Sequence, residues 1–157
     1  MANPRSAVPE SVTSDLAYRR ISALIHRYAE CIDDGDLEAV SRLFEDATYR
    51  GDGGGVYRGA AAVLDVLRRM VVLYDGVPRT KHVTTNIVID VDETAGTARA
   101  QSYYTVFQAT ENLPLQPIVA GRYHDTFACV DGAWRFTDRL IFIDLRGNLS
   151  QHLRRRP

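Results

Sequence analysis

Three carboxylates gather where the first long helical pattern of this 157-residue chain ends, at Asp33, Asp34 and Asp36. The C-terminal end of a helix carries about half a negative charge from its aligned peptide dipoles. A carboxylate at that end is disfavoured as an anion, so we expect its pKa to rise. Helical spacing places Asp33 on the flank of the apolar stripe, Asp34 in solvent and Asp36 at the cap of a second helix. Asp33 is therefore the acid that we expect to handle protons.

His82 is the residue that could act together with Asp33. It is one of four histidines and falls at the start of a strand-like stretch. An aspartate that binds one imidazole nitrogen fixes the tautomer and leaves the other nitrogen as a general base. The alternative is a surface or hydrogen-bonded structural histidine. Proximity of Asp33 and His82 at one cavity decides between the two.

Two tyrosines could bind a substrate oxygen. Tyr28 lies on the buried stripe of the first helix, where it is either a core aromatic or a phenol that donates to a substrate. Tyr103 and Tyr104 point to opposite faces of one strand, so one of them can reach a pocket, and we favour Tyr104. Both Tyr28 and Tyr104 are predicted substrate-binding residues.

Arg139 is a charged residue in a mostly apolar run on the final strand. A buried guanidinium needs a partner. It is either half of a structural ion pair or an anchor for a substrate carboxylate or oxyanion, and the sequence favours neither.

No motif indicates a metal, a nucleotide or a nucleophilic serine. His124 and Asp125 are adjacent in a strand and face opposite ways, so one ion cannot easily bind both. The glycine-rich stretch 51–55 lacks the Lys-Ser/Thr of a phosphate-binding loop and is typical of a hairpin or pocket-mouth loop. There is no Gly-x-Ser-x-Gly. We expect neither a metal nor a cofactor.

The elements that must position these residues fall into two groups. Helical spacing predicts three helices, at residues 15–33, 37–44 and 60–73, and 47–50 reads as a short strand. Alternation then predicts four long strands, at residues 79–92, 97–109, 117–130 and 133–145. In the first of these, strict alternation puts His82, Thr84, Asn86, Val88 and Asp90 on one face. Helices followed by an antiparallel meander indicate an α+β fold, with three N-terminal helices on one face of a sheet curved into a cone.

The amino-acid composition limits the kinds of partner and cellular location that we expect for this protein. The chain is 45% hydrophobic and 25% charged with a net charge of −1, so nothing favours nucleic acid or an acidic membrane as a partner. Cys31 and Cys129 fit no disulfide framework, and no signal peptide or membrane-spanning stretch is visible, so we expect a cytoplasmic protein. We expect a disordered arm at residues 1–13, one domain at 14–147 and a solvated tail at 148–157.

Several short motifs occur together in a specific order. They are Tyr28-x4-Asp33 with Gly35-Asp36, Leu43-Phe44-x-Asp46-Ala47, Tyr57-x-Gly59, Lys81-His82-x-x-x-Asn86, Gly121-x-Tyr123-x-Asp125 and Asp131-Gly132-x-Trp134-Arg135-Phe136. Over residues 14–145 the chain resembles the SnoaL-like branch of the nuclear-transport-factor-like superfamily, with a cystatin-like fold. Within it, the sequence is most similar to the scytalone dehydratase, bile-acid 7α-dehydratase and hexachlorocyclohexane dehydrochlorinase families.

The resemblance implies a chemistry. Those families use a His–Asp pair as the base of a cofactor-independent elimination. The resemblance implies that His82 and Asp33 form this pair here, and that Tyr28 and Arg139 match a tyrosine and an arginine of the families' sites. The sequence shows no second pocket histidine of the scytalone dehydratase kind. We expect a dehydratase-type lyase on a small hydrophobic, polycyclic or polyketide-like substrate, and a homodimer or homotrimer. A polyketide cyclase, an isomerase, a ligand-binding protein and a dioxygenase β subunit are the alternatives.

Overall fold

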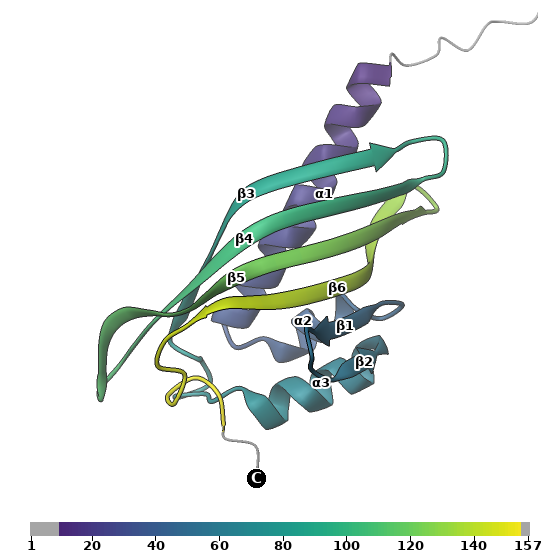
Figure 1. Cartoon of the computed structure of the whole chain (residues 1–157). Helices are drawn as coiled ribbons and strands as arrows, with labels where there is room; N and C mark the ends of the chain where they lie inside the picture. The colour runs from purple at the N-terminus through teal and green to yellow at the C-terminus, as the bar shows by residue number, and fades with distance from the viewer. Residues whose placement is uncertain (1–9, 155–157) are drawn as a thin grey trace, which may run out of the picture.

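Three helices and a curved six-stranded sheet make up the part of the chain that the computed structural model describes, residues 10–154 (Figure 1). The helices are α1 (Glu10–Asp33), α2 (Leu37–Arg42) and α3 (Gly59–Met70). The strands are β1 (Thr48–Gly51), β2 (Val56–Arg58), β3 (Thr80–Asp92), β4 (Thr97–Thr110), β5 (Leu113–Val130) and β6 (Ala133–Arg146). The α+β architecture expected from the sequence is confirmed.

The sheet has the order β2-β1-β6-β5-β4-β3. Strands β3 to β6 form the predicted antiparallel meander. The short strand β1 adds to it in parallel with β6, and β2 pairs with β1 at the edge. Sequence patterns missed β2, because three residues are too few for a periodic signal, and they placed the start of β5 four residues late.

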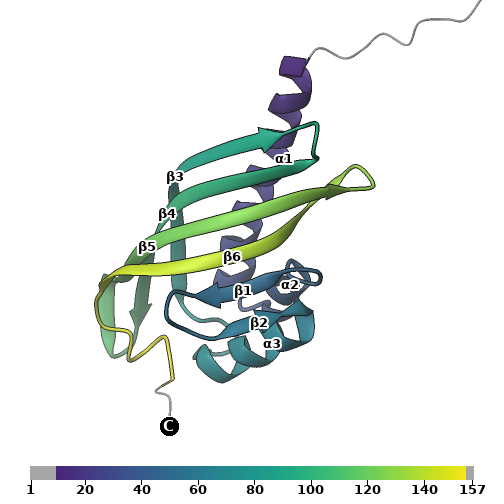
Figure 2. The same cartoon turned by 45° about the vertical axis from the view of Figure 1, so that its right-hand side comes forward.

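Helix α1 crosses the inner face of this sheet, as Figures 1 and 2 both show. It buries Ile21, Ile25 and Ile32 there. The helix begins at Glu10, earlier than predicted, so residues 10–13 of the expected disordered arm are helical, while residues 1–9 lie outside the described residues. None of the helices within residues 10–154 is long and apolar enough to span a membrane.

A bulge in β3 overturns the strict alternation expected there. The register with β4 shifts between Thr85 and Val88, and Asn86 has a φ of +53°. Before the bulge, His82 and Thr84 face inward; after it, Ile87, Ile89 and Val91 do so. An extra residue reverses which parity faces the core, so one strand can present polar groups at one end and apolar groups at the other.

The C-terminal segment, residues 147–154, returns across the wide end of the sheet. Gly147 N donates to Ile118 O, Val72 N donates to His152 O and Arg154 N donates to Met70 O. Residues 148–154 therefore pack on the domain, where the sequence suggested a solvated tail.

Candidate active site

Asp33 and His82 are joined by a short hydrogen bond, with Asp33 Oδ1 2.6 Å from His82 Nδ1. Asp33 Oδ2 also accepts from the backbone N–H of His82 at 2.8 Å, and Oδ1 accepts from Thr80 Oγ1 at 2.7 Å. Both side chains are more than nine-tenths buried. Because a carboxylate only accepts, Nδ1 of His82 carries a proton, and in the neutral imidazole the lone pair is therefore on Nε2.

The end of α1 explains why these residues meet. Gly35 stops the helix with a φ of +77°, and a Cβ there would lie 2.0 Å from the carbonyl oxygen of Gly76. Only glycine lets the turn that precedes β3 approach this closely. Asp36 then caps α2 by accepting from Ala39 N. The carboxylate of Asp33 is thus held against the first residues of β3, where Thr80 and His82 share one face.

The pKa of Asp33 moves in the direction opposite to the one expected. Burial works to raise it, but the hydrogen bonds and charge of His82 and the hydroxyl of Thr80 outweigh burial and leave the pKa of this carboxyl below its ordinary value. Three donors to one carboxylate stabilise the anion more than the helix dipole disfavours it. Asp33 therefore orients His82 as an anion.

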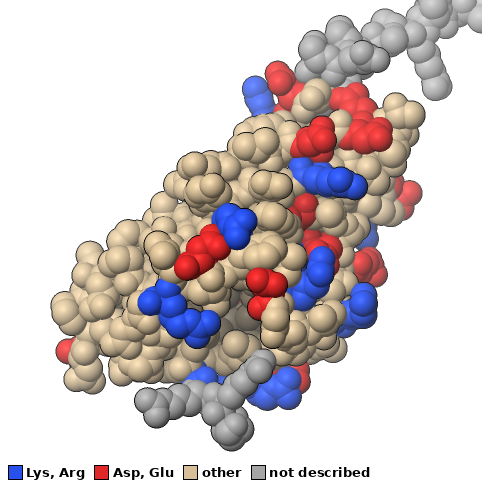
Figure 3. All heavy atoms as spheres, in the orientation of Figure 1, with Lys and Arg blue, Asp and Glu red and all other residues tan. Residues whose placement is uncertain are grey.

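His82 faces a cavity of about 660 Å³ between the sheet, α1, α3 and the C-terminal segment. Figure 3 shows the molecule hollowed on this side, with charged side chains of both signs around the opening. The lining is mostly apolar, and it includes Leu67, Met70, Val106 and Ile141. Volume and lining are typical of a site for a small organic molecule.

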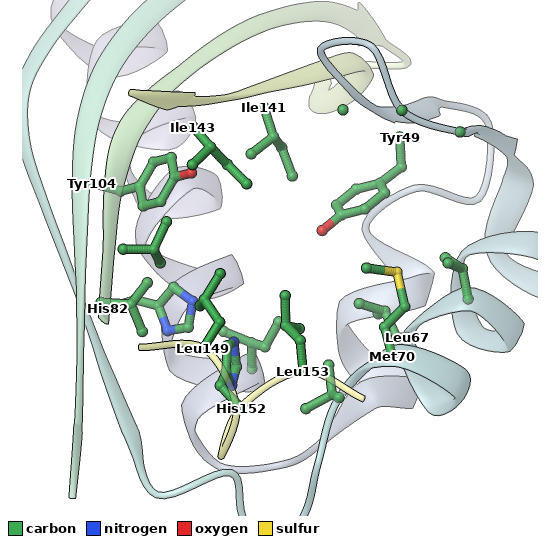
Figure 4. A pocket seen from close by; sticks show the side chains of 18 of the residues that line it. Tyr49, Leu67, Met70, His82, Tyr104, Ile141, Ile143, Leu149, His152 and Leu153 are labelled. Carbon is green, nitrogen blue, oxygen red and sulfur yellow. The ribbon is translucent and has the colours of Figure 1, made fainter. Parts of the chain in front are cut away.

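Tyr28 and Tyr49 place a pair of hydroxyl groups in the cavity wall, with their oxygens 3.0 Å apart. Burial raises the pKa of Tyr28 and, more strongly, that of Tyr49. Both hydroxyls therefore stay protonated. One donates to the other, so one proton of the pair is left to donate to a guest. In Figure 4 the phenol of Tyr49 points into the cavity from the side opposite His82.

Tyr104 lies in the cavity wall and Tyr103 is exposed on the other face of the sheet. The hydroxyl of Tyr104 donates to the backbone oxygen of Phe142 at 2.9 Å, and burial raises its pKa. The ring stacks on Tyr123 with centroids 4.3 Å apart. Tyr104 thus offers a guest an aromatic surface, while its hydroxyl is occupied.

Arg139 does not reach the cavity surface. It is fully buried and forms a bidentate ion pair with Asp125, at 2.8 Å and 2.7 Å. Its guanidinium lies 4.3 Å from the ring centroid of Tyr28 and 4.1 Å from that of Tyr123. Of the two roles left open by the sequence, this geometry favours the structural ion pair, which supports Tyr28 from behind.

Among the cavity residues that sequence reasoning missed are Tyr49 and His152. Tyr49 lies on the short strand β1, and nothing in its sequence shows that β1 pairs in parallel with β6. His152 belongs to the segment taken for a tail, so the expectation of no second histidine in the pocket was wrong. Its ring centroid is 6.3 Å from that of His82.

No set of three or more His, Cys, Asp or Glu side chains within residues 10–154 is arranged to hold a metal ion. The chemistry that the site offers from its own residues is proton abstraction by an oriented imidazole, with phenol donors near an oxygen of the guest.

Comparisons with known proteins agree with this fold. A search of curated proteins found no significant match. Among solved structures, a protein of unknown function from Mycobacterium tuberculosis is 29% identical, with a TM-score of 0.73 over 88% of this chain and 78% of that one. A candidate scytalone dehydratase from Novosphingobium aromaticivorans is 25% identical, with a TM-score of 0.69 over 86% and 89%.

The β subunit of a candidate aromatic-ring-hydroxylating dioxygenase, also from Novosphingobium aromaticivorans, is 23% identical, with a TM-score of 0.70 over 89% of this chain and 97% of that one. At that identity the likeness shows the fold alone. Other neighbours are described as cystatin-like or related to nuclear transport factor 2. The neighbours and the cavity support a protein that binds or transforms a small molecule. The model of the SnoaL-like domain matches residues 15–140, and the chain belongs to this family.

Proposed function

We propose that the protein is a cofactor-independent lyase that removes water from a small hydrophobic β-hydroxy carbonyl compound, with polycyclic and polyketide-like molecules as the substrate class. One observation carries the proposal: His82, whose Nδ1 is 2.6 Å from Asp33, presents its ring to an apolar cavity. A structural histidine has no need of both a buried anionic partner and a hollow in front of it.

The first step is the transfer of a proton from carbon to His82. Nε2 takes the proton next to the carbonyl group, and the electron pair of the C–H bond moves to the carbonyl oxygen as an enolate. Asp33 stabilises the imidazolium that forms. Base assistance of this kind typically contributes about 10²–10⁴-fold.

The second step expels the hydroxyl group. The enolate returns its electrons to carbon, the C=C bond forms and the C–O bond breaks. The imidazolium of His82 gives its proton to the departing hydroxide, so water leaves and the imidazole is neutral again. The proton left on the Tyr28–Tyr49 pair stabilises the enolate oxygen, and one such donor is typically worth about 10²–10³-fold.

Cyclisation and isomerisation begin with the same proton abstraction, so the family's other reactions remain alternatives for the second step. A dioxygenase β subunit, by contrast, does not need an oriented base inside an open cavity. The apolar lining supports an oily substrate over a sugar or a nucleotide.

The test uses β-hydroxy ketones built on one, two and three fused rings, of which β-hydroxytetralone gives a fluorescent naphthol when it loses water. Mass spectrometry identifies the loss of water and separates elimination from cyclisation. We expect turnover by the wild type, a loss of at least 10²-fold in His82→Gln, and wild-type rates in the control His124→Gln, which lies outside the cavity lining. Conversion by His82→Gln at the wild-type rate would contradict the proposal.

A further inference from the structure

The imidazole of His152 is a buried polar group in the cavity wall that the proposed mechanism leaves unused. The residue is only 6% exposed and contributes to the cavity wall. Within residues 10–154, its Nδ1 is enclosed and has no hydrogen-bond partner. An enclosed nitrogen without a partner destabilises the folded state, so packing alone does not explain an imidazole here, and the ring nitrogen left to meet a guest is Nε2.

The backbone around His152 is fixed at several points. Its carbonyl oxygen accepts from Val72 N at 2.9 Å, and its own N–H donates to Leu149 O at 3.0 Å. The preceding carbonyl, of Gln151, accepts from Tyr74 Oη at 2.7 Å and from Gln108 Nε2 at 3.0 Å. These bonds fix the backbone from which the ring projects, which helps to position it as a binding group requires.

The rings of His152 and His82 lie next to each other, with centroids 6.3 Å apart and planes inclined by 65° (Figure 4). Two hydrogen bonds of about 2.6–3.2 Å each nearly span such a gap. One oxygen atom of a guest can therefore lie within reach of both imidazoles.

The charge state of His152 suits an uncharged oxygen. Burial, reinforced by His82 and opposed by Asp33, lowers its pKa to about 4, so the ring is neutral at pH 7. A neutral imidazole offers one N–H donor and one lone pair. A hydroxyl group has the complementary donor and acceptor, whereas a carboxylate can only accept.

We propose that His152 binds a hydroxyl group of the guest and holds its oxygen beside His82. If the proposed lyase reaction is correct, on which this part rests, that hydroxyl is the leaving group. His152 then keeps it in line for the proton that returns from His82 and itself neither gains nor loses a proton. The C-terminal segment is thereby part of the binding site.

The binding test compares two unreactive probes, tetralin and tetralol, in which a hydroxyl group replaces one hydrogen of the saturated ring. Neither has a carbonyl group, so neither can undergo the proposed elimination. We expect the wild type to prefer tetralol, and His152→Phe to lose about tenfold of this preference, the value of one good hydrogen bond. Tetralin should bind both proteins alike.

Tyr49→Phe and His124→Phe are the matched controls, one inside the cavity and one outside its lining. Loss of the tetralol preference in Tyr49→Phe with its retention in His152→Phe would overturn the proposal, because the tyrosine pair would then be the anchor. If His152→Phe does not fold, nitrogen-15 NMR of the wild-type imidazole gives the answer. Comparison with the spectrum of His152→Asn identifies the ring resonances of His152. Tetralol must shift these resonances and tetralin must not, and equal shifts with both compounds would contradict the proposal.

Turnover separates this inference from the proposed function. If the protein prefers tetralol through His152 but dehydrates no β-hydroxy ketone, the proposed role of His152 in binding holds and the proposed lyase activity is refuted. If His152→Phe dehydrates the hydroxy ketone as well as the wild type does, the proposed lyase activity holds and the role of His152 is refuted. If both hold, His152→Phe lowers kcat/KM for the hydroxy ketone, and His152→Asn restores part of it.

Discussion

Asp33 holds His82 at two points, with Oδ1 2.6 Å from the ring Nδ1 and Oδ2 2.8 Å from the backbone N. The double contact fixes both the position of the strand and the tautomer of the ring. A change at Asp33 therefore affects catalysis and folding together, and the two effects can be separated with pH.

Asp33→Asn should lose turnover by at least 10²-fold, because a neutral amide does not stabilise the imidazolium and its NH2 group can donate to Nδ1, which selects the tautomer with the proton on Nε2. The pKa of Asp33 lies below its ordinary value of 3.8 in the folded state. Its contribution to stability is therefore fully present above pH 3.8 and lost as pH falls through the folded pKa. Denaturant titrations should show a steeper acid loss in the wild type than in Asp33→Asn; parallel acid limbs would contradict this.

His152 should impose a second pH dependence, in a higher range. Its pKa falls from 6.5 to about 4 on folding, chiefly through burial. The folded state then favours the neutral ring, so its stability is fully present above pH 6.5 and falls as pH drops towards 4, by up to about 3 kcal/mol. The difference in unfolding free energy between the wild type and His152→Asn should shrink across this window. A constant difference would show that the ring titrates normally.

Tyr49→Phe tests the donor pair without disturbing the base. Removing this hydroxyl breaks its 3.0 Å contact with Tyr28, so the one phenol that remains must donate to the enolate without the partner that positions and polarises it. We expect kcat to fall by about 10²-fold with little change in the thermal unfolding midpoint. Tyr103→Phe is the control, because Tyr103 is exposed on the other face of the sheet. Equal rates in Tyr49→Phe and the wild type would remove the pair from the mechanism.

The ion pair of Arg139 and Asp125 is expected to govern stability. Asp125→Asn leaves a fully buried guanidinium without its counterion, which typically costs about 3–5 kcal/mol. The same two strands carry a bidentate control pair, Arg122 and Asp144, with side chains 39% and 41% exposed. Asp144→Asn should cost less than about 1 kcal/mol. Urea unfolding of both variants measures the contrast, and equal losses would refute it.

The predicted homodimer or homotrimer remains a proposal, and the outer face of the sheet is the surface that we expect it to use. Val83, Tyr103 and Leu145 are exposed there at 44%, 52% and 70%. Exposed apolar side chains that gather on one face are typical of an interface. Light scattering should give an oligomer for the wild type and a monomer for Leu145→Glu. A monomeric wild type would refute the proposal.

The fold and the positions of Asp33 and His82 along it could be predicted because they rest on local signals, whereas the pairing of these two residues was implied by the family resemblance. Apolar spacing marked the helices, and the order of helices before strands set the architecture. Gly35 marked where α1 ends, which placed Asp33, and the strand that follows Asp75-Gly76 placed His82. Each of these signals lies within a few residues of the element that it describes.

The remaining features depend on pairings between distant segments. Counting from the Asp131-Gly132 turn without a bulge would pair Asp125 with Asp138. A bulge between Thr126 and Phe127 shifts the partner to Arg139. The bulge at Asn86, the parallel pairing that brings in Tyr49, and the return of residues 147–154 with His152 are likewise set by tertiary packing, which periodicity does not report.

The most direct test of the central claim uses tetralone, which has hydrogens next to its carbonyl but no hydroxyl group to lose. In deuterium oxide, a base in the cavity exchanges those hydrogens whatever step follows, so the measurement isolates proton abstraction. We predict exchange with the wild type well above the buffer rate and a loss of at least 10²-fold in folded His82→Gln. Exchange at equal rates in the two proteins, or none above buffer in the wild type, would contradict the account.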